Sequence, residues 1–201
     1  MAETESLLMP VDEYLKAGFH IGTKFRTKAM GQFIYKVRPD GLAVLNVQKI
    51  NERIILAARL LAQFKPEDVV IVCRRENGWH SVELFSKLTG ISVFTGRYPP
   101  GILTNPNLEN FIETKLIFVC DPHPDKNVIN DAKKIGIPVI ALCDTNNETK
   151  DVDLVIPCNN KGKKSLGLLF FVLTREYLKV KGLIKSDEEF KATLDEFSPP
   201  E

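Results

Sequence analysis

The chain has 201 residues, of which 44% are hydrophobic and 26% are charged, values typical of one globular domain with a substantial core. No apolar run reaches the ~18 residues of a membrane-spanning helix, and the acidic N-terminus lacks the basic region of a secretory signal. The four cysteines lie far apart without a paired CxxC motif, and three of them end or follow apolar β-like runs. We therefore expect buried reduced thiols in a cytoplasmic protein with no membrane partner.

Charge is segregated along the chain, although the formal net charge is only +1. Residues 14–185 hold 26 of the 27 Lys and Arg but 16 of the 26 Asp and Glu, so a basic body lies between acidic ends. The segment from Phe19 to Arg38 contains five bases and no acid. Such segregation is typical of a surface that binds a polyanion, and a merely solvated basic face is the alternative.

The first elements expected are a short helix, a hairpin and a longer helix. Apolar spacing predicts helices over Val11–Ala17 and Lys49–Phe64, the second ending before a proline. Between them, the β-like runs Phe33–Arg38 and Leu42–Asn46 flank a Pro-Asp-Gly turn. We therefore expect an N-terminal β-hairpin.

From residue 68 onward, strand and helix patterns alternate at short spacing. This alternation predicts an α/β fold in which a parallel sheet is covered by helices on both faces and the loops after the strands share one edge. We expect a mobile acidic N-terminus over 1–10, a single α/β domain over 11–185 and an acidic C-terminal helix or tail over 186–201. The expected strands are Asp68–Cys73, Ile91–Thr95, Lys115–Cys120, Pro138–Leu142 and Asp153–Ile156, and the expected helices are Ser81–Leu88, Lys126–Ile135 and Gly162–Lys181.

The most unusual feature is a cluster of three lysines, Lys161, Lys163 and Lys164, where the last long helix begins. A helix N-terminus already carries partial positive charge and offers free backbone N–H groups, so further cations there indicate a bound anion. The letters GKKS resemble the end of a phosphate-binding P-loop. That motif needs a glycine where this chain has Cys158, so a nucleotide is not supported.

Two motifs at strand ends carry carboxylates that could do chemistry. Asp121-Pro-His123-Pro-Asp125 has the donor types of a metal site, but histidines are scarce elsewhere and Asp125 is well placed to cap the next helix. Asp144 could serve as an acid–base group, yet it stands in a run of turn-forming residues. We therefore assign no catalytic residue, no metal and no cofactor.

The loop from Gly96 to Pro106 contains Arg97 and Tyr98, followed by two adjacent prolines. A fixed arginine beside an aromatic ring suits contact with a phosphate or with a stacked base. A purely structural loop is the alternative.

Several long segments, in register, resemble a known family. GRYPPGILTNP at 96–106, IFVCDPHPDKN at 117–127, GIPVIALCDTN at 136–146 and residues 153–182 resemble the small ribosomal subunit protein two family, in the archaeal and eukaryotic branch that includes the laminin receptor precursor. AGFHIGTK at 17–24 is similar to the family's basic N-terminal loop. The resemblance implies a five-stranded parallel sheet and a non-catalytic constituent of the small ribosomal subunit that binds ribosomal RNA and neighbouring ribosomal proteins. The archaeal form fits best, since no long C-terminal extension is present.

The charge pattern and the family motifs together predict an RNA-binding surface that neutralises phosphates with little base-specific contact. One alternative is an α/β enzyme that acts on a phosphorylated metabolite at the carboxyl edge of the sheet. Another is a scaffold that docks only proteins. The predicted RNA-binding residues are Lys24, Arg26, Lys28, Lys36, Arg38, Arg97, Asn159, Asn160, Lys161, Lys163 and Lys164.

Overall fold

The computed structural model describes residues 7–198 and is built around one parallel β-sheet. Five strands lie in the order β4-β3-β5-β6-β7, which confirms the predicted α/β fold. All residues of β3, β5 and β6 are buried, as expected for β-branched runs that are covered on both faces. The strands are β3 (Val69–Cys73), β4 (Ser92–Thr95), β5 (Leu116–Val119), β6 (Val139–Cys143) and β7 (Leu154–Pro157).

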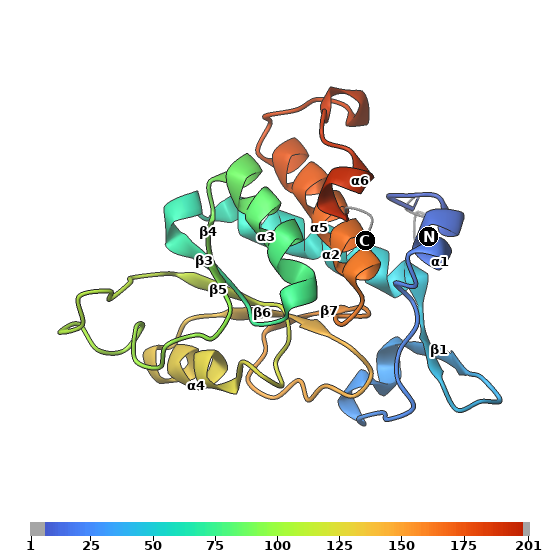
Figure 1. The fold of residues 1–201 in the computed structure, drawn as a ribbon, viewed down its shortest axis with the longest axis horizontal. Coiled ribbons are helices and arrows are strands. Elements are labelled where there is room, and N and C mark those ends of the chain that lie inside the picture. Colours follow the sequence, from blue (N-terminus) through green and yellow to red (C-terminus); the bar gives the residue numbers. More distant parts are fainter. Residues whose placement is uncertain (1–6, 199–201) are drawn as a thin grey trace, which may run out of the picture.

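Helices cover both faces of this sheet (Figure 1). The chain passes from β3 to β4 in one direction along the sheet and from β5 to β6 in the other. Because such crossovers are right-handed, this reversal places α3 (Glu76–Thr89) and α4 (Lys126–Ile135) on opposite faces. On the face of α3, α5 (Lys163–Val180) packs against both α3 and α2 (Val47–Gln63). This central place explains why α5 is apolar nearly all round.

The N-terminal region forms a separate two-stranded hairpin, as predicted. It consists of β1 (Ile34–Val37) and β2 (Ala43–Leu45), which pair antiparallel. Two short elements, α1 (Val11–Lys16) and η1 (Ala29–Phe33), precede it. After the hairpin, the side chain of Asn46 accepts hydrogen bonds from the first backbone N–H groups of α2, so this helix begins before the predicted residue 49.

The C-terminal segment packs on the helical layer through α6 (Leu194–Phe197), which contacts α5 and α3. The short η3 (Asp187–Glu189) is joined to α5 by a 3.1 Å ion pair between Asp187 and Arg175. Phe197 is fully buried, and its carbonyl accepts a 2.8 Å hydrogen bond from Ser81 Oγ on α3. On α5, a Cβ at Gly167 would lie 2.6 Å from Cβ of Ser198, so only glycine leaves room for this segment. The domain limits drawn from the sequence stay predictions, and residues 1–6 and 199–201 of the expected mobile ends lie outside the described residues.

Four cysteines, at positions 73, 120, 143 and 158, are free and buried, as predicted. Burial raises the pKa of the Cys143 thiol and of the Cys158 thiol, so both stay protonated and behave as small apolar groups. Between residues 7 and 198, no helix combines the length and the apolar character needed to cross a membrane.

Candidate nucleic-acid interface

The carboxyl edge of the sheet is closed by a network of polar side chains centred on Asp121, which follows β5 and is 1% exposed. Its Oδ2 accepts a 2.6 Å hydrogen bond from Nε of Arg75, which also forms an ion pair with it through Nη2. Its Oδ1 accepts hydrogen bonds from Asn147 Nδ2 at 2.9 Å and from His123 N at 3.0 Å. Both carboxylate oxygens are therefore occupied by protein donors, and Asp121 serves as a structural anion.

A second buried carboxylate, Asp144, holds one of the predicted RNA-binding lysines. Lys161 Nζ lies 2.9 Å from Asp144 Oδ2 and donates a 3.0 Å hydrogen bond to Asn146 Oδ1. The other oxygen of Asp144 accepts a 2.6 Å hydrogen bond from Thr145 N, as expected for a turn. Much of the charge of Lys161 is thus neutralised within the protein.

The two asparagines of the β7–α5 loop have structural contacts. Asn160 is 1% exposed, and its Nδ2 donates to the Leu142 carbonyl at 3.0 Å and to Asn147 Oδ1 at 3.1 Å. Asn159 Nδ2 donates to the Gly18 carbonyl at 3.2 Å, while its Oδ1 accepts from the backbone N–H groups that precede α5. Their direct contact with RNA stays a prediction, whereas their role in shaping the loop is visible.

Residues 18–28, which we call the N-terminal arm, lie across this edge of the sheet. Thr23 N donates to Thr145 Oγ1 at 2.9 Å, and Thr27 N donates to the Thr145 carbonyl at the same distance. A Cβ at Gly22 would lie 2.9 Å from Thr145 Oγ1 and 3.1 Å from the Ala43 carbonyl oxygen. The close approach of the arm therefore depends on glycine at position 22, and it covers the edge where an α/β enzyme would bind a substrate.

The predicted cap at Asp125 has the expected position but lacks the expected bond. Asp125 precedes α4 at the N-cap position, yet its side chain makes no capping hydrogen bond, and its buried Oδ2 has no partner among residues 7–198. Burial raises the pKa of Asp125 from 3.8 to about 6, the charge of Asp121 adds to the rise, and Arg74 and Arg75 oppose it. In the described part of the chain, no three His, Cys, Asp or Glu side chains are grouped to hold a metal ion.

Replacing Asp125 by Asn is expected to stabilise the protein above pH 6. The native state binds the carboxyl proton more tightly than the unfolded chain does. The stabilising contribution of the protonated form is therefore complete below about pH 4 and is lost as the pH rises through about 6. Because asparagine does not titrate, Asp125→Asn should gain up to roughly 3 kcal/mol over the wild type as the pH rises from about 4 to above 6. Urea unfolding across this pH range measures the difference, and parallel pH profiles of the two proteins would contradict the assignment.

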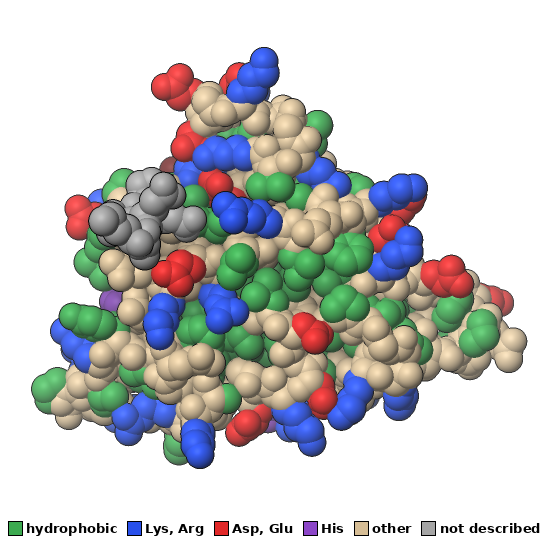
Figure 2. All heavy atoms as spheres, turned by 180° about the vertical axis from the view of Figure 1, so that it is seen from behind, with side chains coloured by type: hydrophobic (Ala, Val, Ile, Leu, Met, Phe, Trp, Pro, Cys, Tyr) green, Lys and Arg blue, Asp and Glu red, His purple; other side chains and the backbone are tan. Residues whose placement is uncertain are grey.

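The arm and the hairpin carry exposed cations on one side of the molecule. Figure 2, which shows the molecule from behind, has Lys and Arg side chains along its lower left, the part that includes the hairpin. The arm is joined to the β7–α5 loop because Asn159 N donates to the Phe19 carbonyl at 3.1 Å. The structure thus brings together two basic segments that are far apart in the sequence. The exposed or half-buried cations of the arm, the hairpin and the start of α5, which together we call the basic face, are Lys24, Arg26, Lys28, Lys36, Arg38, Lys163 and Lys164. Lys164 lies at the margin of this face, where it lines a small pocket with Glu13 and Asp195.

Arg97 is exposed but lies apart from the basic face, because it follows β4 at the far end of the strand order from β7. Four strand spacings of ~4.8 Å separate these strands by roughly 19 Å.

The neighbouring Tyr98 is 3% exposed, and its hydroxyl donates to Asp131 Oδ2 at 3.4 Å. Burial and the nearby carboxylate raise the pKa of Tyr98 to about 12. The prediction that this ring could stack on a base was wrong, since the ring packs in the core.

Two exposed aromatic side chains on the basic face were missed from the sequence. Phe25 is 80% exposed between Lys24 and Arg26, and Tyr35 is 69% exposed beside Lys36. The Lys36 ammonium lies 6.0 Å from the centre of the Tyr35 ring. Aromatic residues that alternate with bases were the available signal, because such interleaving is typical of surfaces that bind single-stranded nucleic acid.

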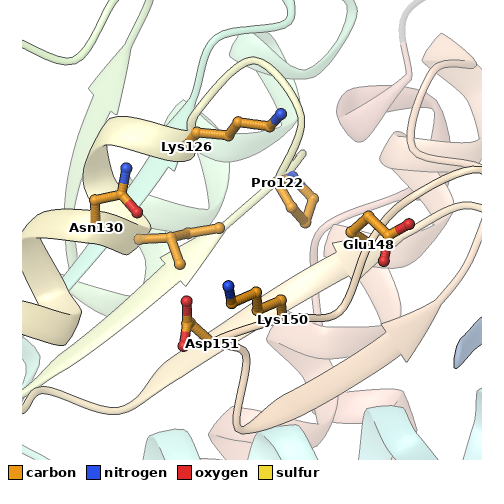
Figure 3. Close-up of a pocket in the computed structure, with 7 residues that line it drawn as sticks. Pro122, Lys126, Asn130, Glu148, Lys150 and Asp151 are labelled. Carbon is orange, nitrogen blue, oxygen red and sulfur yellow. The ribbon is translucent and has the colours of Figure 1, made fainter.

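A pocket of about 340 Å³ opens between α4 and the loop that follows β6. Figure 3 shows Lys126 and Asn130 on the helix side and Glu148, Lys150 and Asp151 on the loop side. Asp151 forms a 2.9 Å ion pair with Lys133, a residue that does not line the pocket. Acids and bases are balanced around this pocket, so its electrostatics favour an anion less than those of the basic face do.

Comparison with known proteins gives consistent results over nearly the whole chain. A family model described as Ribosomal protein S2 matches residues 109–179. The small ribosomal subunit protein uS2 of Thermoplasma acidophilum is 47% identical over 193 residues, covering 96% of this chain and 97% of that protein. The protein of the same name from Nanoarchaeum equitans is 45% identical over 190 residues, covering 94% of each chain. That from Methanococcus maripaludis is 46% identical over 193 residues, covering 96% of this chain and 87% of the relative.

Proposed function

We propose that this chain, which belongs to the ribosomal protein S2 family, is a structural constituent of the small ribosomal subunit in the cytoplasm and binds its RNA through the basic face. The observation that carries the proposal is the placement of the N-terminal arm. It extends three exposed cations, Lys24, Arg26 and Lys28, from a backbone that is hydrogen-bonded to the sheet edge. A backbone that is already fixed reduces the entropy lost when its cations meet an array of phosphates.

The electrostatics of the loop before α5 refine this proposal. Lys163 and Lys164 stand at the N-terminus of α5, where the helix dipole adds to their positive potential. Lys161 is paired with Asp144 and contributes by holding the loop in place. Asn159 and Asn160 contribute in the same way, since their amides bond to the protein. The proposed phosphate contacts are Lys24, Arg26, Lys28, Lys36, Arg38, Lys163 and Lys164, with Arg97 as a separate contact at the other end of the sheet.

The acidic C-terminal segment and the exposed apolar residues near the hairpin suit contacts with neighbouring ribosomal proteins. Val11, Leu15, Tyr35 and Val37 are each more than two-fifths exposed. They line a groove of about 810 Å³ between α1 and the hairpin, together with the cations Lys36 and Arg38. The apolar side chains of a neighbouring protein would complement the apolar part of this groove, while Lys36 and Arg38 stay available to phosphates.

The phosphate contacts are tested by a triple variant, Lys24→Ala, Arg26→Ala and Lys28→Ala. Each phosphate contact adds about 0.7–0.9 to the slope of log K against log salt, so the variant should bind small-subunit ribosomal RNA with a slope lower by roughly 2–3. The matched control replaces Lys65, Lys87 and Lys115, which are exposed at the opposite edge of the sheet. The control removes the same charge and should retain the wild-type slope.

Equal slopes for the two triple variants would show that only net charge matters and would overturn the assignment of the basic face. The ribosomal placement is tested separately, by sedimentation and crosslinking in purified small subunits. Failure of the wild-type chain to sediment with these subunits would contradict it.

The alternative of an α/β enzyme at the carboxyl edge finds no support in the described residues. The carboxylates it requires, Asp121 and Asp144, are paired with Arg75 and Lys161. The arm lies over the same edge. The enzyme alternative would be supported if the protein turned over a phosphorylated metabolite and lost this activity, while staying folded, when either aspartate was replaced.

A further inference from the structure

Phe25 is exposed in a way that folding alone does not explain. It is 80% exposed, the highest value among the exposed large apolar side chains of the described residues. Exposed apolar residues are common, but a phenylalanine ring this exposed gains almost nothing from folding, because it is in water in both the folded and the unfolded chain. The ring contributes nothing to the core, so it is available for a contact outside this chain.

The backbone that carries this ring is fixed. The Phe25 carbonyl accepts hydrogen bonds from Thr23 Oγ1 at 2.9 Å and from Thr145 Oγ1 at 3.1 Å. Thr145 is fully buried at the end of β6, and Thr27 anchors the arm again by donating from Oγ1 to the Asn147 carbonyl at 2.8 Å. The ring is therefore held out from a rigid support, which reduces the entropy lost when a partner stacks on it.

The charges around the ring determine which partner fits. Lys24 and Arg26 flank it directly, Lys28 follows, and no acid occurs between residues 19 and 38. A protein pocket for Phe25 would have to bring matching acids, whereas a single-stranded nucleic acid offers both a flat base and neighbouring phosphates. Resting on the function proposed above, we propose that Phe25 stacks on an unpaired RNA base while Lys24 and Arg26 hold the adjacent phosphates.

The test separates stacking from charge by measuring affinity across a series of salt concentrations. The probes are small-subunit ribosomal RNA and a short single-stranded oligoadenylate that carries one 2-aminopurine. Stacking is worth about 1–3 kcal/mol per base, so Phe25→Ala should weaken binding roughly 5- to 150-fold with an unchanged salt slope. Phe25→Tyr, which keeps the ring, should bind like the wild type and quench the 2-aminopurine. Phe25→Leu, which keeps an apolar side chain without a π-face, should lose most of the affinity.

Two controls make each outcome decisive. Leu88→Ala truncates an exposed side chain on α3, outside the basic face, and should leave RNA affinity unchanged. Urea unfolding should show equal stability for all Phe25 variants, since the ring is in solvent.

Wild-type RNA affinity in Phe25→Ala would overturn the stacking inference while leaving the phosphate contacts intact. If Phe25→Ala keeps its RNA affinity but no longer joins small subunits, the ring binds a protein. Absence of RNA binding by the wild type would instead refute the proposed function itself.

Discussion

Replacing Asp121 by Asn is expected to lower the free energy of unfolding by about 2–4 kcal/mol, because the change breaks a buried ion pair. Arg75 would lose its anion, and the new amide group would face the donors of Asn147 and His123. Burial of both carboxylate oxygens leaves no solvent to compensate these losses. Urea unfolding at pH 7, with the slope m checked for constancy, measures the effect.

The matched control for this prediction is Asp125→Asn. The chemical change is the same, and Asp125 is also almost fully buried, but its Oδ2 has no partner. The two variants are therefore expected to shift stability in opposite directions at neutral pH. Wild-type stability of Asp121→Asn would contradict the structural role of this carboxylate and would direct attention back to chemistry at the sheet edge.

Replacing Phe197 by Ala is expected to lower the free energy of unfolding by about 3–4 kcal/mol. The ring is fully buried and packs edge-on against Phe171 at a centroid distance of 5.8 Å. Its removal leaves a cavity, and the close approach of the Phe197 backbone to Gly167 limits relaxation. The acidic C-terminal segment thus packs on the helical layer, with Phe197 as its fully buried aromatic anchor.

Phe190→Ala is the control in the same segment. Phe190 also packs on Phe171, at 5.3 Å, but it is half-buried, so its loss should cost roughly 1 kcal/mol. Hydrogen exchange of the amides after residue 190 distinguishes two outcomes of Phe197→Ala. Global destabilisation supports the role proposed for the anchor. Loss of protection confined to this segment, with an unchanged unfolding midpoint, would show that the core does not depend on it.

The order of elements was predictable because it depends on local patterns. Continuous β-branched runs such as Val69–Cys73 and Leu116–Val119 identify buried strands without any knowledge of their neighbours. Most predicted boundaries differ from the observed ones by one or two residues. The start of α2 differs by two residues because the Asn46 side chain caps the helix early, and the larger error is α3, which begins at Glu76 instead of residue 81.

The environment of individual side chains was much less predictable. Tyr98 and Phe25 are both aromatic residues beside arginines, yet one ring lies in the core and the other in solvent. Their local sequences do not distinguish them. The difference arises because α4 supplies Asp131 as a partner for Tyr98, whereas the arm holds Phe25 beyond the reach of other described elements.

The sequence by itself determined the alternation of strands and helices, the basic body between acidic ends and the family to which the chain belongs, because each is a property of neighbouring residues or of ordered motifs. Only the tertiary structure decided which charges are free. Asp144 neutralises Lys161 from 17 positions away, and Thr145 anchors the arm across 122 positions at Thr23. Such pairings follow from strand order and crossover direction, which bring distant loops to one edge of the sheet. The basic face and the exposed ring of Phe25 are therefore consequences of the fold.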